Sequence, residues 1–518
     1  MRAVLSPSIL KWLNHIILKY GFWNLYLTIF AFLIGIYLRA DWFLAPRSFW
    51  NNSYCLALAL MRVSWNEILG QLPLGQQAPL GFVIVSKIIG ELFRYNEYAL
   101  LFIPFVAGIA SAILFLIISV KLLHPKVVFL ATFLWALNPA LIFYTGEFKQ
   151  YSTDVFFTLL LFLLALRTVK NSFKSGLPAM MTTGVIALFF SHSAVFVLAG
   201  CGGTFIFTVF SLPGNIRMQT SVRLAKAAVL WIVSFGFIYF LYISKSTHNF
   251  MYTYHAEGFA SFGSIHYFMI WSSQTFKNAF IFPLGMAPRW ASFLWPVGAL
   301  LTVAGIVISC KRNSGITCGG ITMLFFLLLA SALGKYPVNT GDSVLTPRLI
   351  LFAVPFFLIW ISEGADSCIP GLGLKKYFAV FTGLLLSGIM FVSWATTFYI
   401  RQEVGPLVDA YKKNKGIDDI IWVYPGAITA FEYNTRLSPM PYCTGLIDNG
   451  GGTVPEDSMY DSLKPLLKRT GRIWILFSQS YENEEQKVFN FINQSGCKKV
   501  SEIQTAGAML FCYETQNK

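Results

Sequence analysis

The chain has 518 residues, of which 56% are hydrophobic and only 12% are charged, and its mean hydropathy is +0.60. A soluble protein carries about 25% charged residues. The formal charge of +15 at pH 7 would suit a nucleic-acid partner, but basic residues in membrane loops are the more ordinary explanation. The composition therefore excludes a soluble globular enzyme, predicts no nucleic-acid partner and indicates a polytopic membrane protein in contact with membrane lipid.

Eleven apolar segments are predicted to cross the membrane, because each approaches or exceeds the ~20 residues that a helix needs to span the hydrocarbon. In chain order they are 21–39, 98–120, 127–144, 153–168, 177–194, 195–212, 227–244, 291–310, 316–334, 347–362 and 377–399. A further apolar run, Ala78 to Phe93, is slightly short for a span and carries Lys87 and Glu91 on one helix face. We predict an interfacial or partly inserted helix there.

Loop charge orients these segments. With the N-terminus in the cytoplasm, each short inner loop has at least two basic residues, as in KLLHPK, RTVKNSFK and NIRMQTSVRLAK. The short outer connections EFKQYS and SHS have one and none. Counting 78–93 as a full span would invert every later loop. The positive-inside rule therefore favours eleven spans, with the N-terminus cytoplasmic and the C-terminus outside.

After Arg401 the composition becomes that of a soluble domain. DDIIWVYP and RIWILFS are typical of buried strands, PEDSMYDSLKPLLKR and ENEEQKVFNFINQ of helices, and KKVSEIQ and AMLFCYE of a strand pair. We predict a transmembrane domain at 1–400, with its first external loop at 40–97, and an extracytoplasmic α/β domain at 401–518. The fold class is thus mainly α and polytopic, with an α/β domain at the C-terminal end.

Polar and ionisable groups at the mouths of predicted spans are the candidates for chemistry, because such groups are costly near lipid. Glu147, Lys149, Gln150, Tyr151 and Asp154 gather at one outer mouth. A lysine and a tyrosine hydroxyl there suit a phosphate. The alternative is an internally paired helix start, with Asp154 favoured by the helix dipole.

Arg348 begins another span from the outside, shortly after Tyr336 and Pro337. Snorkelling toward the interface is the alternative explanation for this arginine. An arginine on the outer side is not needed for orientation, however, so we treat Arg348 as a candidate site residue.

The histidines and cysteines form no pattern of metal ligands. The eight cysteines include no Cys-x-x-Cys spacing, so neither a zinc site nor a redox motif is indicated. The group that invites a metal has a spacing that matches no familiar ligand set: His192, His248, His255, Glu257 and His266. We predict no cofactor and leave a divalent metal open.

The first external loop contains the stretch Trp50-Asn51-Asn52-Ser53, and its nearest acidic residues are Asp41 and Glu67. Asp41 directly follows the first span, where pairing with Arg39 or Arg47 is the ordinary explanation. Glu67 suits the wet face of an interfacial helix.

Several stretches, taken in order, carry a resemblance to a known family. They are Trp50 followed by LAL, then QQAPLGF, GEFKQYSTDVFF, YPV…PRLILFAVP…SEG, and VYPGAITAFEYN with RIWILFS in the tail. In this order the chain resembles, nearly end to end, the GT-C membrane glycosyltransferases, in particular the bacterial branch of lipid A aminoarabinose transferases and protein O-mannosyltransferases. No single motif is specific; their order and spacing are.

The resemblance implies sugar transfer at the outer face of the bacterial cytoplasmic (inner) membrane. The donor would be a polyprenyl-phosphate-linked sugar, and the acceptor a hydroxyl of an envelope glycolipid, polysaccharide or protein. In the family, an aspartate in the first external loop takes the acceptor proton while the hydroxyl attacks the anomeric carbon with inversion. Such general base catalysis is worth roughly 10²–10⁴-fold, and stabilisation of the leaving phosphate adds an electrostatic contribution.

Carried over to this sequence, the resemblance places Asn52 at the aspartate's position and Ser53 at that of the glutamate beside it. It assigns the donor phosphate to Lys149, Gln150, Tyr151 and Arg348.

The remaining candidates would line the acceptor side or the pocket: Trp50, Ser53, Gln77, Glu147 and Tyr336. Where some relatives have a lysine before the proline of the QQAPLGF segment, this chain has Gln76 and Gln77.

An asparagine amide cannot accept a proton and can only hold a hydroxyl in place. Three interpretations stay open. Asp41, or in second place Glu67, replaces the base; or the protein is a non-catalytic relative that binds a lipid-linked sugar; or it is a slow transferase with an acidic acceptor or a differently aligned loop.

From a different class, the protein could be a transporter or scaffold for lipid-linked sugars. A transporter places polar groups along a path at mid-membrane, often with inverted repeats. The sequence shows no such repeat, and its candidate groups gather at one face, which favours the transferase.

Overall fold

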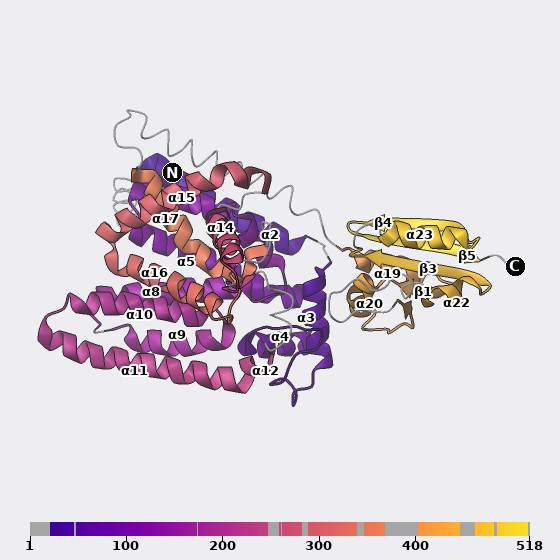
Figure 1. Ribbon diagram of the computed structural model, residues 1–518, viewed down its shortest axis with the longest axis horizontal. Coiled ribbons are helices and arrows are strands. Elements are labelled where there is room, and N and C mark those ends of the chain that lie inside the picture. Colours follow the sequence, from indigo (N-terminus) through magenta and orange to yellow (C-terminus); the bar gives the residue numbers. More distant parts are fainter. Residues whose placement is uncertain are drawn as a thin grey trace, which may run out of the picture.

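The computed structural model describes residues 21–45, 48–173, 175–246, 258–260, 262–281, 288–338, 346–367, 402–445, 461–480 and 484–515. Within them, a helical bundle and a C-terminal α/β part lie side by side (Figure 1). The seven segments long and apolar enough to cross a membrane fall in α2 (Phe22–Leu44), α5 (Glu97–Leu122), α8 (Tyr151–Lys170), α11 (Gly214–Ile238) with η3 (Tyr239–Ile243), α15 (Pro288–Arg312), α16 (Ser314–Ala332), and η6 (Thr346–Ala353) with α17 (Val354–Ser367).

Three further apolar elements complete the comparison with the predicted spans. Taken together, α6 (Val128–Ala136) and α7 (Pro139–Phe143) are long and apolar enough for one broken span, with a bend of 56° between them; α9 (Leu177–Phe190) and α10 (Ala194–Phe210) are shorter apolar helices. Eight of the eleven predicted spans thus coincide with segments long and apolar enough to cross a membrane, when α6 and α7 are taken together. The predicted spans 177–194 and 195–212 fall on α9 and α10, whose 14 and 17 residues are too few by that measure, and 377–399 lies outside the described residues. The predicted fold class, a mainly helical polytopic membrane protein with a C-terminal α/β part, is confirmed.

The first loop contains α3 (Asn51–Arg62) and α4 (Leu80–Leu92). As expected for the run 78–93, α4 is too short to span, since 13 residues give a helix of about 20 Å. Lys87 is buried and donates to the carbonyls of Leu60 and Val63, both at 2.9 Å, and its Nζ lies 3.0 Å from Oε1 of Glu91. The lysine therefore fastens α4 to the C-terminal end of α3.

The break between α6 and α7 has an identifiable cause in sequence. Pro139 occupies the first turn of α7, and the side chain of Asn138 caps that helix by accepting from the N–H of Leu141 at 3.0 Å. The carbonyls left free where α6 ends are met by Arg39 of α2, which donates to Trp135 O at 3.1 Å and Ala136 O at 3.2 Å. Arg39 itself is completely buried.

That contact corrects one expectation from the sequence. Pairing with Arg39 or Arg47 was the ordinary alternative for Asp41. The Arg39 guanidinium points into the bundle, while Asp41 is exposed on another side of α2, so Arg39 is not its partner. Arg47, the other suggested partner, lies outside the described residues.

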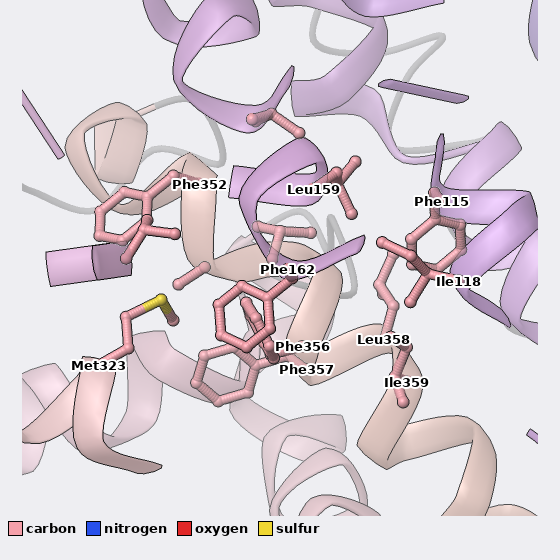
Figure 2. Packing of buried hydrophobic residues seen from close by; sticks show 14 of the residues in the cluster. Phe115, Ile118, Leu159, Phe162, Met323, Phe352, Phe356, Phe357, Leu358 and Ile359 are labelled. Atoms are coloured by element: carbon pink, nitrogen blue, oxygen red, sulfur yellow. The ribbon is translucent and has the colours of Figure 1, made fainter. Parts of the chain in front are cut away.

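Two spans occupy the centre of the bundle. Of the apolar stretch of α8, 72% of the residues are buried, and of the stretch through η6 and α17, 89%, against only 17% in α11. The rings of Phe162 in α8 and Phe356 in α17 lie 4.2 Å apart, and Figure 2 shows them among other packed apolar side chains. The start of α8 and of η6 is therefore held by the best-packed part of the protein.

The C-terminal part is a five-stranded sheet in the order β2-β1-β3-β5-β4. β1 (Ile420–Val423) is parallel to β2 (Cys443–Thr444) and β3 (Gly471–Ser478), while β5 (Ala508–Thr515) is antiparallel to β3 and β4 (Lys498–Thr505). Its helices are α19 (Val404–Asn414), α20 (Ile428–Asn434), α22 (Lys464–Leu467) and α23 (Glu484–Gln494).

Four strands and α23 lie where the sequence predicts them. Of the helix predicted over 455–469, the structure describes only residues 461–469, which contain α22. β2, α19 and α20 were not predicted, since each is short or carries a mixed pattern.

A shared apolar core joins the C-terminal part to the first loop, where Figure 1 shows α3 and α4 facing it. The ring of Tyr433 in α20 lies 5.4 Å from Phe49 and 5.2 Å from Tyr54. Its buried hydroxyl donates to the carbonyl of Tyr95, and Arg62 forms an ion pair with Glu432. The C-terminal part is therefore packed against α3; the boundary at 401 stays a prediction.

Candidate functional site

The first wall of the candidate site is the N-terminal turn of α3. Trp50 precedes the helix in an extended conformation, and its carbonyl accepts from the N–H groups of Ser53 at 2.8 Å and Tyr54 at 3.0 Å. The half-buried Trp50 ring meets Phe143 edge to face at 5.7 Å. The sequence stretch that suggested an acceptor site thus forms a fixed helix start.

The second wall is the turn between α7 and α8, which carries Glu147 to Gln150. A Cβ on Gly146 would lie 2.3 Å from the Trp42 ring, and one on Gly108 would lie 2.1 Å from Thr145. These two glycines let the turn pass tightly between α2 and α5. The hydroxyl of Ser152 donates to the carbonyl of Tyr144 at 2.8 Å and closes the turn.

The two walls contact each other through side chains that come from separate sequence motifs. Ser53 Oγ donates to Glu147 Oε2 at 3.1 Å, and only 1% of Ser53 and 4% of Glu147 is exposed. Lys149 Nζ donates to Gln76 Oε1 at 2.5 Å. The segments around Trp50, QQAPLGF and GEFKQYS therefore meet at one place.

Arg348, at the start of η6, lies against the same turn. Its guanidinium donates hydrogen bonds to the hydroxyl oxygens of Tyr144 and Tyr151, and its charge acts on Lys149. The hydroxyl of Tyr336 donates to the carbonyl of Leu349, the residue after Arg348, at 2.8 Å. Two cations from distant parts of the chain thus come together, with Tyr336 beside them.

The charge balance of this place favours an anion. Burial lowers the pKa of Lys149 to about 7; the positive charge of Arg348 also lowers it, whereas Cys55 and Glu147 raise it. A phosphate would oppose the lowering, because an opposite charge within reach favours the charged form of lysine. The helix dipole of α8, whose first residue is Tyr151, adds positive potential at the same end.

Asn52 lies on the first turn of α3, next to Ser53, and its side chain is half-buried. Its amide has no hydrogen bond with any of the residues described. Gln77 is half-buried, beside the Gln76 that binds Lys149. Gln150 is 7% exposed, and its Oε1 has no hydrogen-bond partner in the described chain.

The two acids considered as substitute bases lie apart from this arrangement. Asp41 is exposed on α2. Glu67 is exposed beyond the C-terminal end of α3 and accepts from the N–H and hydroxyl of Ser64 at 3.2 and 2.7 Å, which lowers its pKa. The 12 residues of α3, about 18 Å of helix, separate Glu67 from the Asn52 end.

The sequence patterns did not predict two residues that lie near the candidate site, Tyr144 and Thr429. Tyr144 was counted inside the predicted span 127–144, and only the break after α6 places it at the site. Thr429 of α20 donates to Asn51 Oδ1, which also lies 3.8 Å from Cys55 Sγ. No local signal could pair two residues separated by 378 positions.

For metals, no group of three or more His, Cys, Asp or Glu side chains with suitable geometry occurs in the part of the chain that the structure describes. His248, His255 and Glu257 lie outside that part. The possibility of a divalent metal at these residues therefore remains untested.

The helical bundle and the C-terminal sheet together form a fold that is also found in solved membrane-protein structures. Among solved structures, the chain is similar in fold to ArnT from Cupriavidus metallidurans. Its crystal structure bound to undecaprenyl phosphate matches with a TM-score of 0.52 at 10% sequence identity, covering 95% of this chain and 98% of ArnT. The apo structure matches with a TM-score of 0.51 at 10% identity, covering 95% and 97%.

At this identity the likeness shows the fold. No protein-family model matches the sequence, and neither does any curated protein. The predicted resemblance to a GT-C aminoarabinose transferase is confirmed at the level of the fold.

Proposed function

We propose that the protein transfers a sugar from a polyprenyl-phosphate donor to a hydroxyl of an envelope glycolipid, polysaccharide or protein. One observation carries the proposal: Lys149 and Arg348 come together beside the N-terminal turn of α3, although about 200 residues separate them. The ArnT fold supports it, since ArnT was crystallised with undecaprenyl phosphate. The reaction would take place at the outer face of a bacterial cytoplasmic membrane, with the N-terminus cytoplasmic and the C-terminal part outside.

In this proposal the cations bind the donor phosphate. Lys149 supplies a point charge and Arg348 a planar fork of donors, while the hydroxyls of Tyr144 and Tyr151 orient the guanidinium. As the sugar–oxygen bond breaks, the leaving phosphate gains negative charge, and preorganised cations stabilise that change. Gln150, whose carbonyl oxygen lacks a partner in the described chain, completes the donor side.

The acceptor side is built on α3. The Asn52 amide can both donate to and accept from a hydroxyl, and its half-buried side chain makes no other hydrogen bond among the described residues. In this proposal Trp50, Gln77 and Tyr336 are assigned to the pocket for the acceptor. Orientation of the acceptor contributes to the rate even where the amide takes no proton.

The test uses the purified full chain in lipid nanodiscs. Undecaprenyl phosphate affinity is measured first, and transfer from a panel of polyprenyl-phosphate sugars second. Lys149→Gln and Arg348→Gln should each weaken affinity about 10- to 100-fold, because a hydrogen bond to a charged group contributes about 1.5–3 kcal/mol. Lys335→Gln, at an exposed lysine near Tyr336, is the matched control and should bind like the wild type.

Equal affinity for both variants and the wild type would refute the phosphate site. Binding that depends on both cations, without transfer from any donor in the panel, would favour the non-catalytic carrier or scaffold. Vectorial movement of the lipid-linked sugar across the nanodisc or vesicle membrane without transfer would favour the transporter.

A further inference from the structure

We infer that Glu147 is the general base of this reaction and fills the role that the amide of Asn52 cannot. The inference rests on the proposed function and adds the residue that accepts the acceptor proton. It starts from a juxtaposition: the Glu147 carboxylate accepts a hydrogen bond at 3.1 Å from Ser53, the neighbour of Asn52. Sequence analysis placed Glu147 only among the pocket residues.

The position of Glu147 joins the two sides of the site. Through Ser53 it contacts the turn that carries Asn52, and its charge acts on both Lys149 and Tyr144. An acceptor hydroxyl held by Asn52 and directed at a sugar whose phosphate meets Lys149 would therefore pass close to this carboxylate. With 4% of its surface exposed, Glu147 is shielded from bulk water.

The other carboxylates described in this region are less suited. Asp41 is exposed on α2, and Glu67 lies beyond the opposite end of α3 with its pKa lowered by Ser64. Asp154, a turn into α8, faces the hydroxyls of Ser191 and Ser193. Glu147 is the one whose hydrogen bond reaches the Asn52 turn.

The step balances as follows. The acceptor hydroxyl loses its proton to a Glu147 oxygen while the acceptor oxygen forms a bond to the anomeric carbon. The bond from that carbon to the phosphate oxygen breaks, and its electron pair leaves with the polyprenyl phosphate, whose added negative charge meets Lys149 and Arg348. The products are an inverted glycoside, polyprenyl phosphate and a protonated Glu147, which returns its proton to water.

Ser53 is a positioning residue in this scheme. Its hydroxyl donates to one oxygen of Glu147 and so fixes the plane of the carboxylate. An ionised carboxylate has two oxygens and about four acceptor positions, so a hydrogen bond from Ser53 to Oε2 is compatible with proton transfer to the same carboxylate.

The experiment compares transfer rates under single-turnover conditions, in nanodiscs, using the polyprenyl-phosphate sugar that the wild type accepts from the panel. Glu147→Gln should lose about 10²–10⁴-fold in rate, the usual contribution of a general base, while undecaprenyl phosphate affinity stays within about threefold. The acidic limb of the pH–rate profile, which reports protonation of the base, should disappear with it. Asp41→Asn and Glu67→Gln are matched controls and should keep both rate and limb.

A rescue separates a base from a structural carboxylate. In the double variant Asn52→Asp/Glu147→Gln, a carboxylate returns on the neighbouring turn, and the rate should recover at least about tenfold over Glu147→Gln alone. Ser53→Ala should lower the rate about 3- to 10-fold, the loss of one hydrogen bond of about 1 kcal/mol, and should leave the acidic limb in place. This second variant tests the arrangement even where Glu147→Gln does not fold.

The outcomes are distinguishable. Suppose that the wild type transfers sugar. If Glu147→Gln is then equally fast, or if the acidic limb disappears in Asp41→Asn instead, Glu147 is not the base, and the transferase function still stands. A Ser53→Ala variant as fast as the wild type contradicts the positioning role. Absence of transfer in both the wild type and Asn52→Asp, with phosphate binding intact, overturns the proposed function and the base together.

Discussion

Replacing Arg39 with methionine should destabilise the protein from a position remote from the donor and acceptor. Arg39 is fully buried and donates to three carbonyls, those of Gly35 at 2.9 Å, Trp135 at 3.1 Å and Ala136 at 3.2 Å. The last two belong to the end of α6, directly before the break that redirects the chain toward Glu147. Methionine fills much of the same volume and removes all the donors.

The expected cost follows from the carbonyls that lose their donor. A buried acceptor left unpaired costs about 1–3 kcal/mol, so the loss of the donor at the carbonyls of Trp135 and Ala136 together costs about 2–6 kcal/mol in stability. Removing a buried cation recovers part of its desolvation penalty, and the weak bond from Asn138 N to Trp135 O at 3.4 Å remains. We therefore expect a net loss of about 2–4 kcal/mol.

Thermal unfolding in nanodiscs measures this loss. A chain of this length has an unfolding entropy of about 1 kcal/mol/K, so the unfolding temperature should fall by about 2–4 °C. Arg167→Met, at an exposed arginine of α8, is the matched control and should leave it unchanged. An Arg39→Met protein as stable as the wild type, with unaltered transfer, would refute the account of the broken span.

Three further predictions concern the site and its supports. The affinity for undecaprenyl phosphate should weaken as pH rises from about 7 to 9, because Lys149, with a pKa of about 7, loses its charge in this range. Lys149→Arg should flatten this pH dependence. Equal slopes of affinity against pH for the wild type and Lys149→Arg, measured by equilibrium binding, would contradict the prediction. Gly146→Ala should lower the transfer rate at least about tenfold and leave the protein folded, since a Cβ would lie 2.3 Å from Trp42 and push the Glu147 turn aside; an unchanged rate would refute the close fit. Tyr433→Ala should cost about 3–5 kcal/mol, typical of a buried aromatic, and speed proteolysis of the C-terminal part; cleavage as slow as in the wild type would refute its docking on α3.

The sequence predicts the bundle well because a membrane span is a local property. Eleven spans were predicted from apolar length, of which 377–399 lies outside the described residues. Loop charge kept 78–93 out of that set, and the 13 residues of α4 agree with this. The same local logic selected Lys149 and Arg348, since polar groups at span mouths are conspicuous in an apolar chain.

The errors arose where neighbours in sequence were taken for neighbours in space. Arg39 was considered, beside Arg47, as a partner of Asp41 because it is two residues away, although such residues do not face each other on a helix. The buried stripe of α2 runs through Thr28, Ala31, Gly35, Arg39 and Trp42, with spacings of three and four. That periodicity was readable in advance and places Arg39, but not Asp41, inside.

Other features were out of reach from a single sequence. The bond from Thr429 to Asn51, and the approach of Arg348 to Tyr144, depend on how distant segments pack. The proposed role of Glu147 was also out of reach. The sequence marked Glu147 as a candidate because it is an acidic residue at a span mouth, but only the folded chain shows the hydrogen bond from Ser53.

The helix α3 links these long-range contacts into one argument. Its first turn bonds to Glu147 from the bundle through Ser53, and its flank packs against α20 of the C-terminal part. A helix is stiff over 12 residues, so the tail and the bundle must agree on a single position for Asn52. The proposed donor cations, by contrast, are Lys149 in the turn before α8 and Arg348 in η6. The spans that continue from these two places are the best-buried among the described residues. In the proposed mechanism, the donor side is therefore held by the buried part of the bundle, and the acceptor side by a helix that the C-terminal part also contacts. The proposal thus links the C-terminal part to acceptor binding rather than to the phosphate.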